Sequence, residues 1–217
     1  MRENNPTAHN PDYAEGDLAL LLFPGGTTAQ AGNEKDLVSP DAGVNRLNWL
    51  DFPLTNQVAL KQLTLRVGTS SQSQFDIPLQ ANADISKYQD KTSSPGTQFK
   101  YGPLNMTLKT ATLSYSYNDN QATTGNRYVI VTLAAVNSTT NSVNLYPGNY
   151  MRLQASGNSI EPESGYTLPY SVNASTSTSG IVAFLVPQGT TSFTLVMLAQ
   201  PDASPAISQV TQNFQVQ

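Results

Sequence analysis

The only histidine of this chain, His9, is its one candidate for imidazole chemistry. A Ser–His–Asp triad or a histidine metal site needs an imidazole that the fold holds in place. His9 instead lies between Pro6 and Pro11 in residues 1–15, a polar stretch whose composition predicts a loose arm. We therefore interpret it as a solvated tail residue. The chain has no cysteine, which excludes disulfides, thiolate metal sites and cysteine nucleophiles.

Glu161 and Glu163 have the spacing that most resembles an acid–base pair. Two residues apart on a strand, their side chains would share a face, and carboxylates about 5 to 10 Å apart can cleave a glycosidic bond. Pro162 separates them, however, and no aromatic platform for a sugar is evident beside them. We favour a solvated turn over a glycosidase pair. No catalytic residue is assigned, and the chain is not expected to be an enzyme.

Two loop segments carry oxygen ligands of the kind that calcium prefers. They are residues 33–36, Asn-Glu-Lys-Asp, together with Asp41, and residues 118–120, Asn-Asp-Asn. Neither has the Asp-x-Asp-x-Asn-Gly spacing of a calcium loop, and clusters of Asn and Asp commonly form ordinary turns. We therefore expect no bound metal and no cofactor.

Tyrosines are the remaining candidates for recognition, and the C-terminal half is rich in them. Exposed tyrosines bury a large area on binding with little loss of side-chain entropy. Alternatively, tyrosines fill the edges of a β-sandwich while their hydroxyl groups reach solvent. The second interpretation is favoured, and the first stays open. The tyrosines concerned are Tyr115, Tyr117, Tyr128, Tyr146, Tyr150, Tyr166 and Tyr170.

Three glycosylation sequons begin at Asn105, Asn137 and Asn173. A chain so rich in Asn, Ser and Thr is expected to contain such matches by accident. We assign no modification to them.

The composition limits the kinds of partner that the chain can bind. Only 12% of the residues are charged, about half the usual share for a soluble domain, and the net charge is −4. No lysine and arginine cluster is available to displace counterions from phosphates, which argues against nucleic-acid binding. The most hydrophobic run, residues 17–23, is too short to span a membrane and reads as a buried strand that Pro24 stops.

Alternating apolar residues predict an all-β chain. In residues 104–117 the alternation changes phase once, which predicts a β-bulge near Lys109 and Thr110. Residues 128–136 and 181–186 are apolar at nearly every position, so we expect central strands covered on both faces. Further strands are predicted at residues 150–155, 166–172, 193–199 and 207–216. Short strands at this spacing indicate a sandwich or a barrel.

The N-terminal part is sparser. Strands are predicted at residues 18–23, 47–52, 60–67 and 75–79. We therefore divide the chain into the arm, a β lobe at residues 16–82, a linker at residues 83–100 and a β-sandwich at residues 101–217. The sandwich has enough strands for two layers and is expected to fold alone. The lobe is not, because a single sheet with one apolar face must cover that face.

Five segments resemble a known bacterial family in order and spacing. They are Gly125-Asn-Arg-Tyr-Val-Ile-Val-Thr-Leu-Ala-Ala-Val-Asn-Ser-Thr139 and residues 104–113, 150–157, 180–189 and 193–196. This is the domain-of-unknown-function group with the fold of the mycobacterial immunoprotective extracellular antigen. The resemblance covers about residues 101–217 and implies an immunoglobulin-like antiparallel sandwich, export, and attachment to the membrane by a lipid or a preceding helix. It implies no catalytic residues.

The lobe also resembles part of the sandwich. Residues 47–53, 63–67 and 75–79 echo residues 182–187, 193–197 and the final strand to Val216. In both, an apolar residue precedes proline, and x-Thr-Leu-x-Val/Met follows. The lobe is thus a candidate second half of an earlier copy of the same domain, with Trp49, Phe52, Leu63, Leu65 and Val67 as its buried cluster. Chance similarity between two hairpins is the alternative.

These observations favour a non-enzymatic structural or binding module, located outside the cell or tethered to its surface. Its partner would be an unknown protein or glycan at the cell surface, with no nucleic acid and no membrane span in this chain. Any targeting segment is expected to lie outside these 217 residues. The alternative is a carbohydrate-binding module or a carboxylate-only hydrolase accessory domain, suggested by the tyrosines and the acidic loops.

Overall fold

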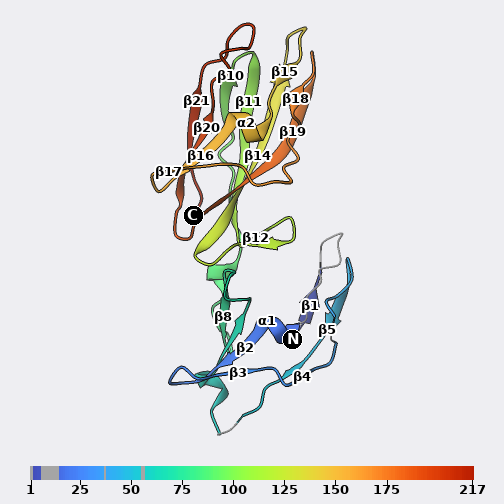
Figure 1. Cartoon of the computed structure of the whole chain (residues 1–217), viewed down its shortest axis with the longest axis vertical. Helices are drawn as coiled ribbons and strands as arrows, with labels where there is room; N and C mark the ends of the chain where they lie inside the picture. The colour runs from blue at the N-terminus through green and yellow to red at the C-terminus, as the bar shows by residue number, and fades with distance from the viewer. Residues whose placement is uncertain (1, 6–14, 37, 55–56) are drawn as a thin grey trace. The chain divides into compact units, whose positions relative to one another are not determined.

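Figure 1 shows a computed structural model that describes residues 2–5, 15–36, 38–54 and 57–217. His9 lies outside these residues. Strands make up 49% of the chain and helices 6%, so the all-β prediction is confirmed. The chain divides into two compact units, residues 1–89 and residues 90–217.

Unit 2, residues 90–217, is a sandwich of two antiparallel sheets (Figure 1). The first sheet has β14 at its centre, with β11 on one side and β19 on the other, and both β9 and β10 pair with the far side of β11. Its strands are β9 (Lys91–Ser93), β10 (Thr97–Tyr101), β11 (Leu104–Ser114), β14 (Asn126–Asn137) and β19 (Ser177–Pro187). The second sheet has the order β17-β16-β20-β21. Its strands are β16 (Met151–Ala155), β17 (Asn158–Ile160), β20 (Ser192–Met197) and β21 (Val210–Gln215).

The chain path through these sheets is that of an immunoglobulin-like sandwich. It runs through β11 and β14 in the first sheet, crosses to β16 and β17, returns to β19, and ends with β20 and β21 in the second sheet. In the immunoglobulin arrangement, two consecutive strands pair in one sheet, and a later strand returns from the other sheet to pair with the second of them. Here β11 and β14 are the two consecutive strands, and β19 is the later strand. The predicted fold class is therefore confirmed by the pairing.

The core forms where the two sheets turn their apolar faces toward each other. Phe184 from the first sheet and Leu195 from the second are both fully buried in one cluster. The predicted β-bulge in β11 is confirmed, because its register against β14 shifts between Leu108 and Thr110. The prediction that residues 128–136 are covered on both faces is wrong, because Ile130 is half-buried and Val136 is 43% exposed. Apolar residues that face solvent explain the misleading pattern.

Short elements complete unit 2. Residues 83–100, predicted as a linker, contain β9 and β10, which belong to the sandwich, so that prediction is wrong at its C-terminal end. The predicted strand at residues 166–172 is reduced to β18 (Ser171–Val172), which pairs with β15 (Val143–Asn144). The other elements are β12 (Ser116–Tyr117), β13 (Asn120–Gln121) and α2 (Pro147–Tyr150).

Unit 1, residues 1–89, is built around one four-stranded antiparallel sheet with the order β3-β2-β7-β8. Its strands are β2 (Ala19–Leu22), β3 (Thr28–Gln30), β7 (Thr64–Val67) and β8 (Phe75–Pro78). Two short pairs accompany it: β1 (Arg2–Asn4) with β5 (Asn45–Leu47), and β4 (Asn33–Glu34) with β6 (Leu50–Asp51). The helical turns are α1 (Glu15–Leu18), η1 (Leu60–Gln62) and η2 (Ser86–Tyr88).

Several expectations for unit 1 are corrected. Residues 2–4, predicted to lie in the loose arm, form β1 because β5 pairs with them. The strand predicted at residues 47–52 is split between β5 and β6. The predicted buried cluster is also wrong, since only Leu63 of its five residues is buried and Trp49 is 48% exposed.

The sheet of unit 1 has one apolar face and one mixed face. Strand register places Leu21, Leu65 and Ile77 side by side on the apolar face. On the opposite face Arg66 donates two hydrogen bonds to Asp76, at 2.7 and 2.8 Å. A sheet with this pattern needs a second layer on its apolar face.

Candidate functional site

The two glutamates are held by different partners. The Oε1 atom of Glu161 lies 2.9 Å from Nη2 of Arg152 in an exposed ion pair. The backbone N–H of Glu163 donates to the carbonyl of Ala183, at 2.8 Å, beside the edge of β19. These contacts describe a segment that lies beside the edge of β19, and Glu163 is half-buried, so the prediction of a solvated turn is wrong.

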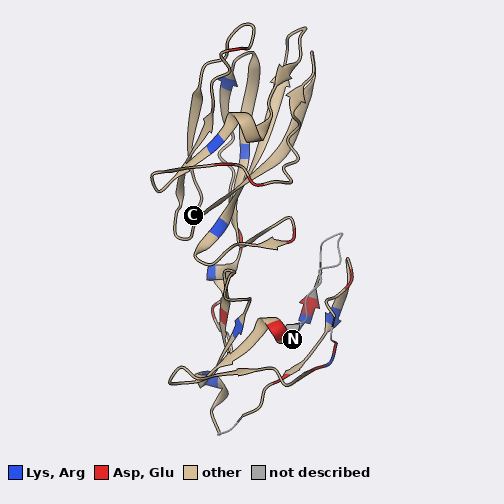
Figure 2. Cartoon of the chain, in the orientation of Figure 1, with Lys and Arg blue, Asp and Glu red and all other residues tan. Residues whose placement is uncertain are grey.

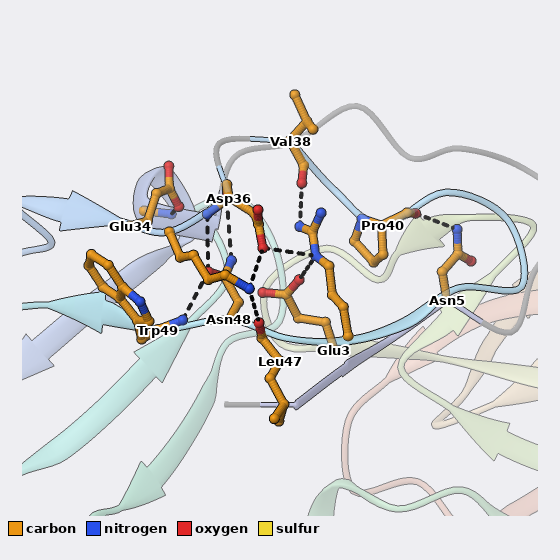
Figure 3. Close-up of polar contacts among 12 residues, drawn as sticks. Glu3, Asn5, Glu34, Asp36, Val38, Pro40, Leu47, Asn48 and Trp49 are labelled. Carbon is orange, nitrogen blue, oxygen red and sulfur yellow. Dashed lines mark hydrogen bonds and ion pairs between the residues drawn. The ribbon is translucent and has the colours of Figure 1, made fainter.

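The first candidate calcium segment belongs to a network of ion pairs in unit 1 (Figure 3). Asp36 lies 3.6 Å from Nζ of Lys35 and 3.9 Å from Nε of Arg46. Glu34 accepts a hydrogen bond from the backbone N–H of Gly16 at 2.8 Å. Nearby cations and amides therefore already balance these carboxylates. Across the described ranges, no group of three or more His, Cys, Asp or Glu side chains is arranged to hold a metal.

Of residues 118–120, the second candidate segment, Asn118 and Asp119 form the turn between β12 and β13, and Asn120 begins β13. Asn118 and Asp119 both adopt positive φ angles, of 48° and 62°. Asn and Asp tolerate this conformation better than other residues with a Cβ, which explains their presence in the turn. The side-chain amide of Asn118 donates to the carbonyl of Gly165 at 3.1 Å.

The sequon asparagine Asn137 is fully buried and acts as a structural clamp. Its Nδ2 donates to the carbonyls of Asn141, Val172 and Asn173, at 2.8, 3.0 and 3.1 Å. Its Oδ1 accepts from the backbone N–H and the hydroxyl of Thr139, at 3.0 and 2.7 Å. The amide that a glycan would modify is thus committed to holding the loop after β14.

Three of the predicted tyrosines do gather, on the part of unit 2 that carries β15, α2 and β18. The ring centroids of Tyr146 and Tyr170 lie 4.7 Å apart, and Tyr166 lies 6.1 Å from each. All three contacts are edge-to-face, the favoured geometry for aromatic pairs. Tyr170 is 63% exposed. Burial, followed by hydrogen bonding to Tyr146, raises the pKa of Tyr166 above its ordinary value, so its hydroxyl stays protonated.

A groove of about 440 Å³ adjoins this tyrosine cluster. Ser142 and Asn144 line both the groove and a shallow depression against Tyr146 and Tyr170, so β15 connects the two surfaces. The far wall of the groove is the loop that contains Asp202. Its volume is within the range of small-ligand sites. We refer to the groove and the tyrosine cluster together as the tyrosine surface.

Buried hydrogen bonds hold the floor of the groove in place. Nε2 of Gln200 donates to the hydroxyl of Tyr101 at 2.8 Å and to the carbonyl of Asn144 at 3.0 Å. Tyr101, which is fully buried, donates in turn to the carbonyl of Leu198 at 2.6 Å. Sequence reasoning missed Tyr101 and Gln200, because a pattern of apolar alternation gives no sign of which polar residues pair across loops.

The tyrosine surface is nearly uncharged. Asp202 is the single charged residue among those that line the groove and the depression. Charged side chains are sparse over the whole of unit 2 (Figure 2). Ring faces, amides and hydroxyls can bind neutral groups by stacking and hydrogen bonding, but they offer no strong attraction to ions.

Of the other four predicted tyrosines, Tyr150 lines the groove and three serve the fold. Tyr115 and Tyr128 are buried, and Tyr115 accepts a hydrogen bond from Nε2 of Gln188 at 2.7 Å. Tyr117 packs on Tyr128 with ring centroids 5.8 Å apart and donates to the carbonyl of Gly165 at 2.9 Å. For these residues, the interpretation as edge fillers of the sandwich describes their surroundings.

No family model matches the sequence, and no curated protein matches it with significance. Solved structures similar to part of the chain include a protein of unknown function from Listeria monocytogenes EGD-e, with 12% identity and a TM-score of 0.44 over 59% of this chain and 86% of that chain. A candidate lipoprotein from Bacillus subtilis has 16% identity and a TM-score of 0.45, over 57% of this chain and 39% of that chain. A conserved hypothetical protein from Bacillus anthracis has 8% identity and a TM-score of 0.42, over 59% and 98%.

In the portions of the chain that the structure describes, no helix has the length and apolar character needed to cross a membrane.

Proposed function

We propose that this chain is a non-enzymatic binding module that acts outside the cell or at its surface, and that it binds its partner through the tyrosine surface. The observation that carries the proposal is the exposure of Tyr170, at 63%, beside two other tyrosines and a preformed groove. An aromatic ring left in water gains contact area when a partner covers it, at little entropic cost. The hydrogen-bonded floor means that little ordering is needed on binding.

The chemistry of the surface favours an uncharged partner. Its lining supplies amides, hydroxyls and tyrosine rings, with Asp202 as its one charge. The family resemblance of residues 101–217 implies export, which supports an extracellular partner. A protein segment rich in neutral polar residues fits this lining, and it is the leading candidate.

A neutral glycan is the second candidate. The edge-to-face rings of Tyr146 and Tyr170 beside Ser142 and Asn144 could stack on the C–H face of a sugar while hydrogen bonding its hydroxyl groups. The protein would then be a carbohydrate-binding module. Neutral and charged glycans on an array separate the two candidates, since a protein-binding module should give no saturable glycan signal.

Site-specific photocrosslinking on intact producing cells tests the proposal. A photoreactive amino acid at position 170 should yield covalent adducts, whereas the same group at Gln154, which is exposed on the second sheet, should not. Tyr146→Ala should reduce the adduct yield at position 170 by about tenfold, the effect of about 1.4 kcal/mol of lost binding. Equal yields at positions 170 and 154, or no adducts at either, would refute the tyrosine surface as the binding site.

A further inference from the structure

Strand pairs of unit 1 recur in the sandwich at a fixed spacing along the sequence. Glu3 of β1 pairs with Arg46 of β5, and Ala135 of β14 pairs with Thr178 of β19, which is 132 residues further along on both strands. The neighbouring residue pairs of β1 and β5 keep the same spacing. β1 and β5 therefore correspond to the end of β14 and the beginning of β19.

Hydrogen bonds outside the ladders keep the same spacing. Nδ2 of Asn5 donates to the carbonyl of Pro40 at 2.9 Å, as Nδ2 of Asn137 donates to that of Val172 at 3.0 Å. The backbone N–H of Asn5 donates to Val44 at 3.0 Å, and that of Asn137 donates to Thr176 at 2.9 Å. The buried clamp of the sandwich thus has a counterpart in unit 1.

The four-stranded sheets also correspond. The order β3-β2-β7-β8 matches β17-β16-β20-β21, with a hairpin at each side and the first strands of the two hairpins adjacent. Leu21 pairs with Leu65 in unit 1, and Leu153 pairs with Leu195 in unit 2. Residues 2–79 therefore repeat the pairing of about residues 134–214. The sequence similarity between residues 63–67 and residues 193–197 agrees with this correspondence. The similarity between residues 47–53 and residues 182–187 lies two positions away from it.

The sandwich shows what lies over such a sheet. Its second sheet packs against β11, β14 and β19. Of these, β11 and residues 126–133 of β14 precede the repeated part of the chain. Within residues 2–5, 15–36, 38–54 and 57–89, no strand takes the place of β11, and β1 pairs with β5 alone.

Burial at matched positions reflects this difference on part of the face. Ala19, Leu21 and Leu63 of unit 1 are buried, as Met151, Leu153 and Phe193 of the sandwich are, so the difference lies at β8 and the adjoining residues of β7. Leu195, Met197 and Phe214 of the sandwich are 0%, 0% and 6% exposed. Their counterparts in unit 1 are only half-buried, as are two further apolar residues of β8 on the same face. We call these five residues the open face: Leu65, Val67, Phe75, Ile77 and Leu79.

We propose that the open face of unit 1 is the docking site of an antiparallel β-hairpin of the β11–β14 type, supplied from outside residues 1–217. The hairpin would present alternating apolar side chains to the open face, and its second strand would extend β1. Its occupant is argued from the repeat, because β11 and β14 cover the matched sheet of the sandwich together with β19. The inference is independent of the tyrosine surface, which lies in unit 2.

The chain itself supplies a probe. Residues 97–133 contain β10, β11 and the first part of β14, so fusing them directly before Arg2 reproduces the connection that joins Leu133 to Ala134 in the sandwich. In the fused full-length chain, amide hydrogen exchange of residues 19–22 and 64–67 should slow by about tenfold or more, the change that about 1.4 kcal/mol of local stability produces. The single tryptophan, Trp49, reports on unit 1 alone by its fluorescence.

Two controls isolate docking from an unspecific effect of the added segment. The same fusion with Asp in place of Met106, Leu108 and Val131 within the added copy keeps its length but loses its apolar face, so it should leave exchange unchanged. In the intact fusion, Leu65→Asp on the open face should abolish the protection, whereas Thr64→Asp on the opposite face should keep it.

The proposal would be overturned if both fusions slowed exchange equally, or if neither did. It would also be overturned if the unmodified chain sedimented as a dimer that Leu65→Asp dissociates, because a second copy would then occupy the open face. Exchange of residues 129–133 in the original sandwich is monitored in parallel, and it should stay constant if the added hairpin docks on unit 1.

Discussion

Units 1 and 2 form the same kind of four-stranded sheet but differ in what they bury. Among the described residues of unit 1, three apolar side chains are buried, namely Ala19, Leu21 and Leu63, whereas unit 2 buries 31. Most of the large apolar side chains that are exposed, including Trp49 and Leu60, belong to unit 1. Strand order and register are therefore the same in a sheet with a packed second layer and in one whose apolar face is only partly covered.

The difference separates two contributions to the fold. Alternating residues, turns and capping hydrogen bonds such as that of Asn5 determine which strands pair. Burial of the apolar face supplies most of the free energy of folding, at about 25 cal/mol per Å². Unit 1 has the first contribution in full and only part of the second, so we expect its stability to be much lower than that of the sandwich.

Separate expression of the two units should give the largest effect. Residues 90–217 alone should unfold cooperatively and show dispersed amide resonances, because their two layers enclose one core. Residues 1–89 alone should show poor dispersion, since a single sheet rarely holds without cover. A monomeric fragment 1–89 with dispersed resonances would contradict the comparison and remove the need for a docked hairpin.

Truncation of matched core positions should show the next largest contrast. Phe184→Ala removes a fully buried ring from the sandwich and should cost about 3–5 kcal/mol. Leu65→Ala on the half-buried open face should cost about 1 kcal/mol or less, since much of its side chain gains little from folding. Urea unfolding of the full chain measures both, with circular dichroism following the sandwich and Trp49 fluorescence following unit 1. Equal costs would mean that the open face is covered in solution.

The two asparagine clamps offer a matched polar pair. Asn137→Ala leaves three buried or partly buried carbonyls without their donor and should destabilise the sandwich by about 2–3 kcal/mol. Asn5→Ala removes the hydrogen bond from Nδ2 to the carbonyl of Pro40 and should cost about 1 kcal/mol. The same urea titrations test this order. A larger loss for Asn5 would show that the clamp matters more where the core is smaller.

The sequence predicted the sandwich well. In unit 1 it located β2, β7 and β8 but not the structure around Trp49, for a physical reason. Alternation located β11, its bulge and β20 because those residues face a core that is present. Residues 47–53 suggested a buried strand around Trp49, yet the strand is split and the ring is exposed, since burial depends on a layer that a local pattern does not specify.

Only part of the candidate site could be predicted from the sequence. Tyrosine content marked Tyr146, Tyr166 and Tyr170, but their clustering depends on the loop that leads to β18 and on the turn of α2. Gln200 lines the groove, and its hydrogen bond to the buried Tyr101 joins residues 99 positions apart. Such long-range side-chain pairs leave no periodic signal.

Ile130 tests the outer face of β14, where the sandwich itself has no covering layer of strands. Its apolar neighbours suggested a strand covered on both faces, but the side chain is half-buried. Ile130→Ala should therefore cost about 1 kcal/mol, well below the cost of Phe184→Ala. A loss above about 2 kcal/mol in urea unfolding would show that a further layer covers the outer face of β14.

The smallest expected effect is the pH dependence of the ion pair on the outer face of unit 1. The two hydrogen bonds from Arg66 are the main cause that lowers the pKa of Asp76 below its ordinary value of 3.8. A carboxyl whose pKa is lower in the folded state stabilises the fold above its unfolded pKa, and this contribution is lost as the pH falls through the folded pKa. Both side chains are about one-third exposed, so solvent screening limits the contribution to about 0.2–1 kcal/mol.

Asp76→Asn should therefore lower the stability of unit 1 at pH 7 by this amount, and this loss should shrink as the pH is lowered toward 2 and Asp76 takes up a proton in the folded state. Trp49 fluorescence during urea unfolding reads this difference for unit 1 alone. Glu161→Gln in the sandwich is the matched control: its carboxylate is 75% exposed opposite Arg152, so we expect almost no change at either pH. A stability loss for Asp76→Asn that persists at pH 2 would show that Asp76 acts through packing or backbone contacts, and that the outer face of unit 1 depends on more than charge.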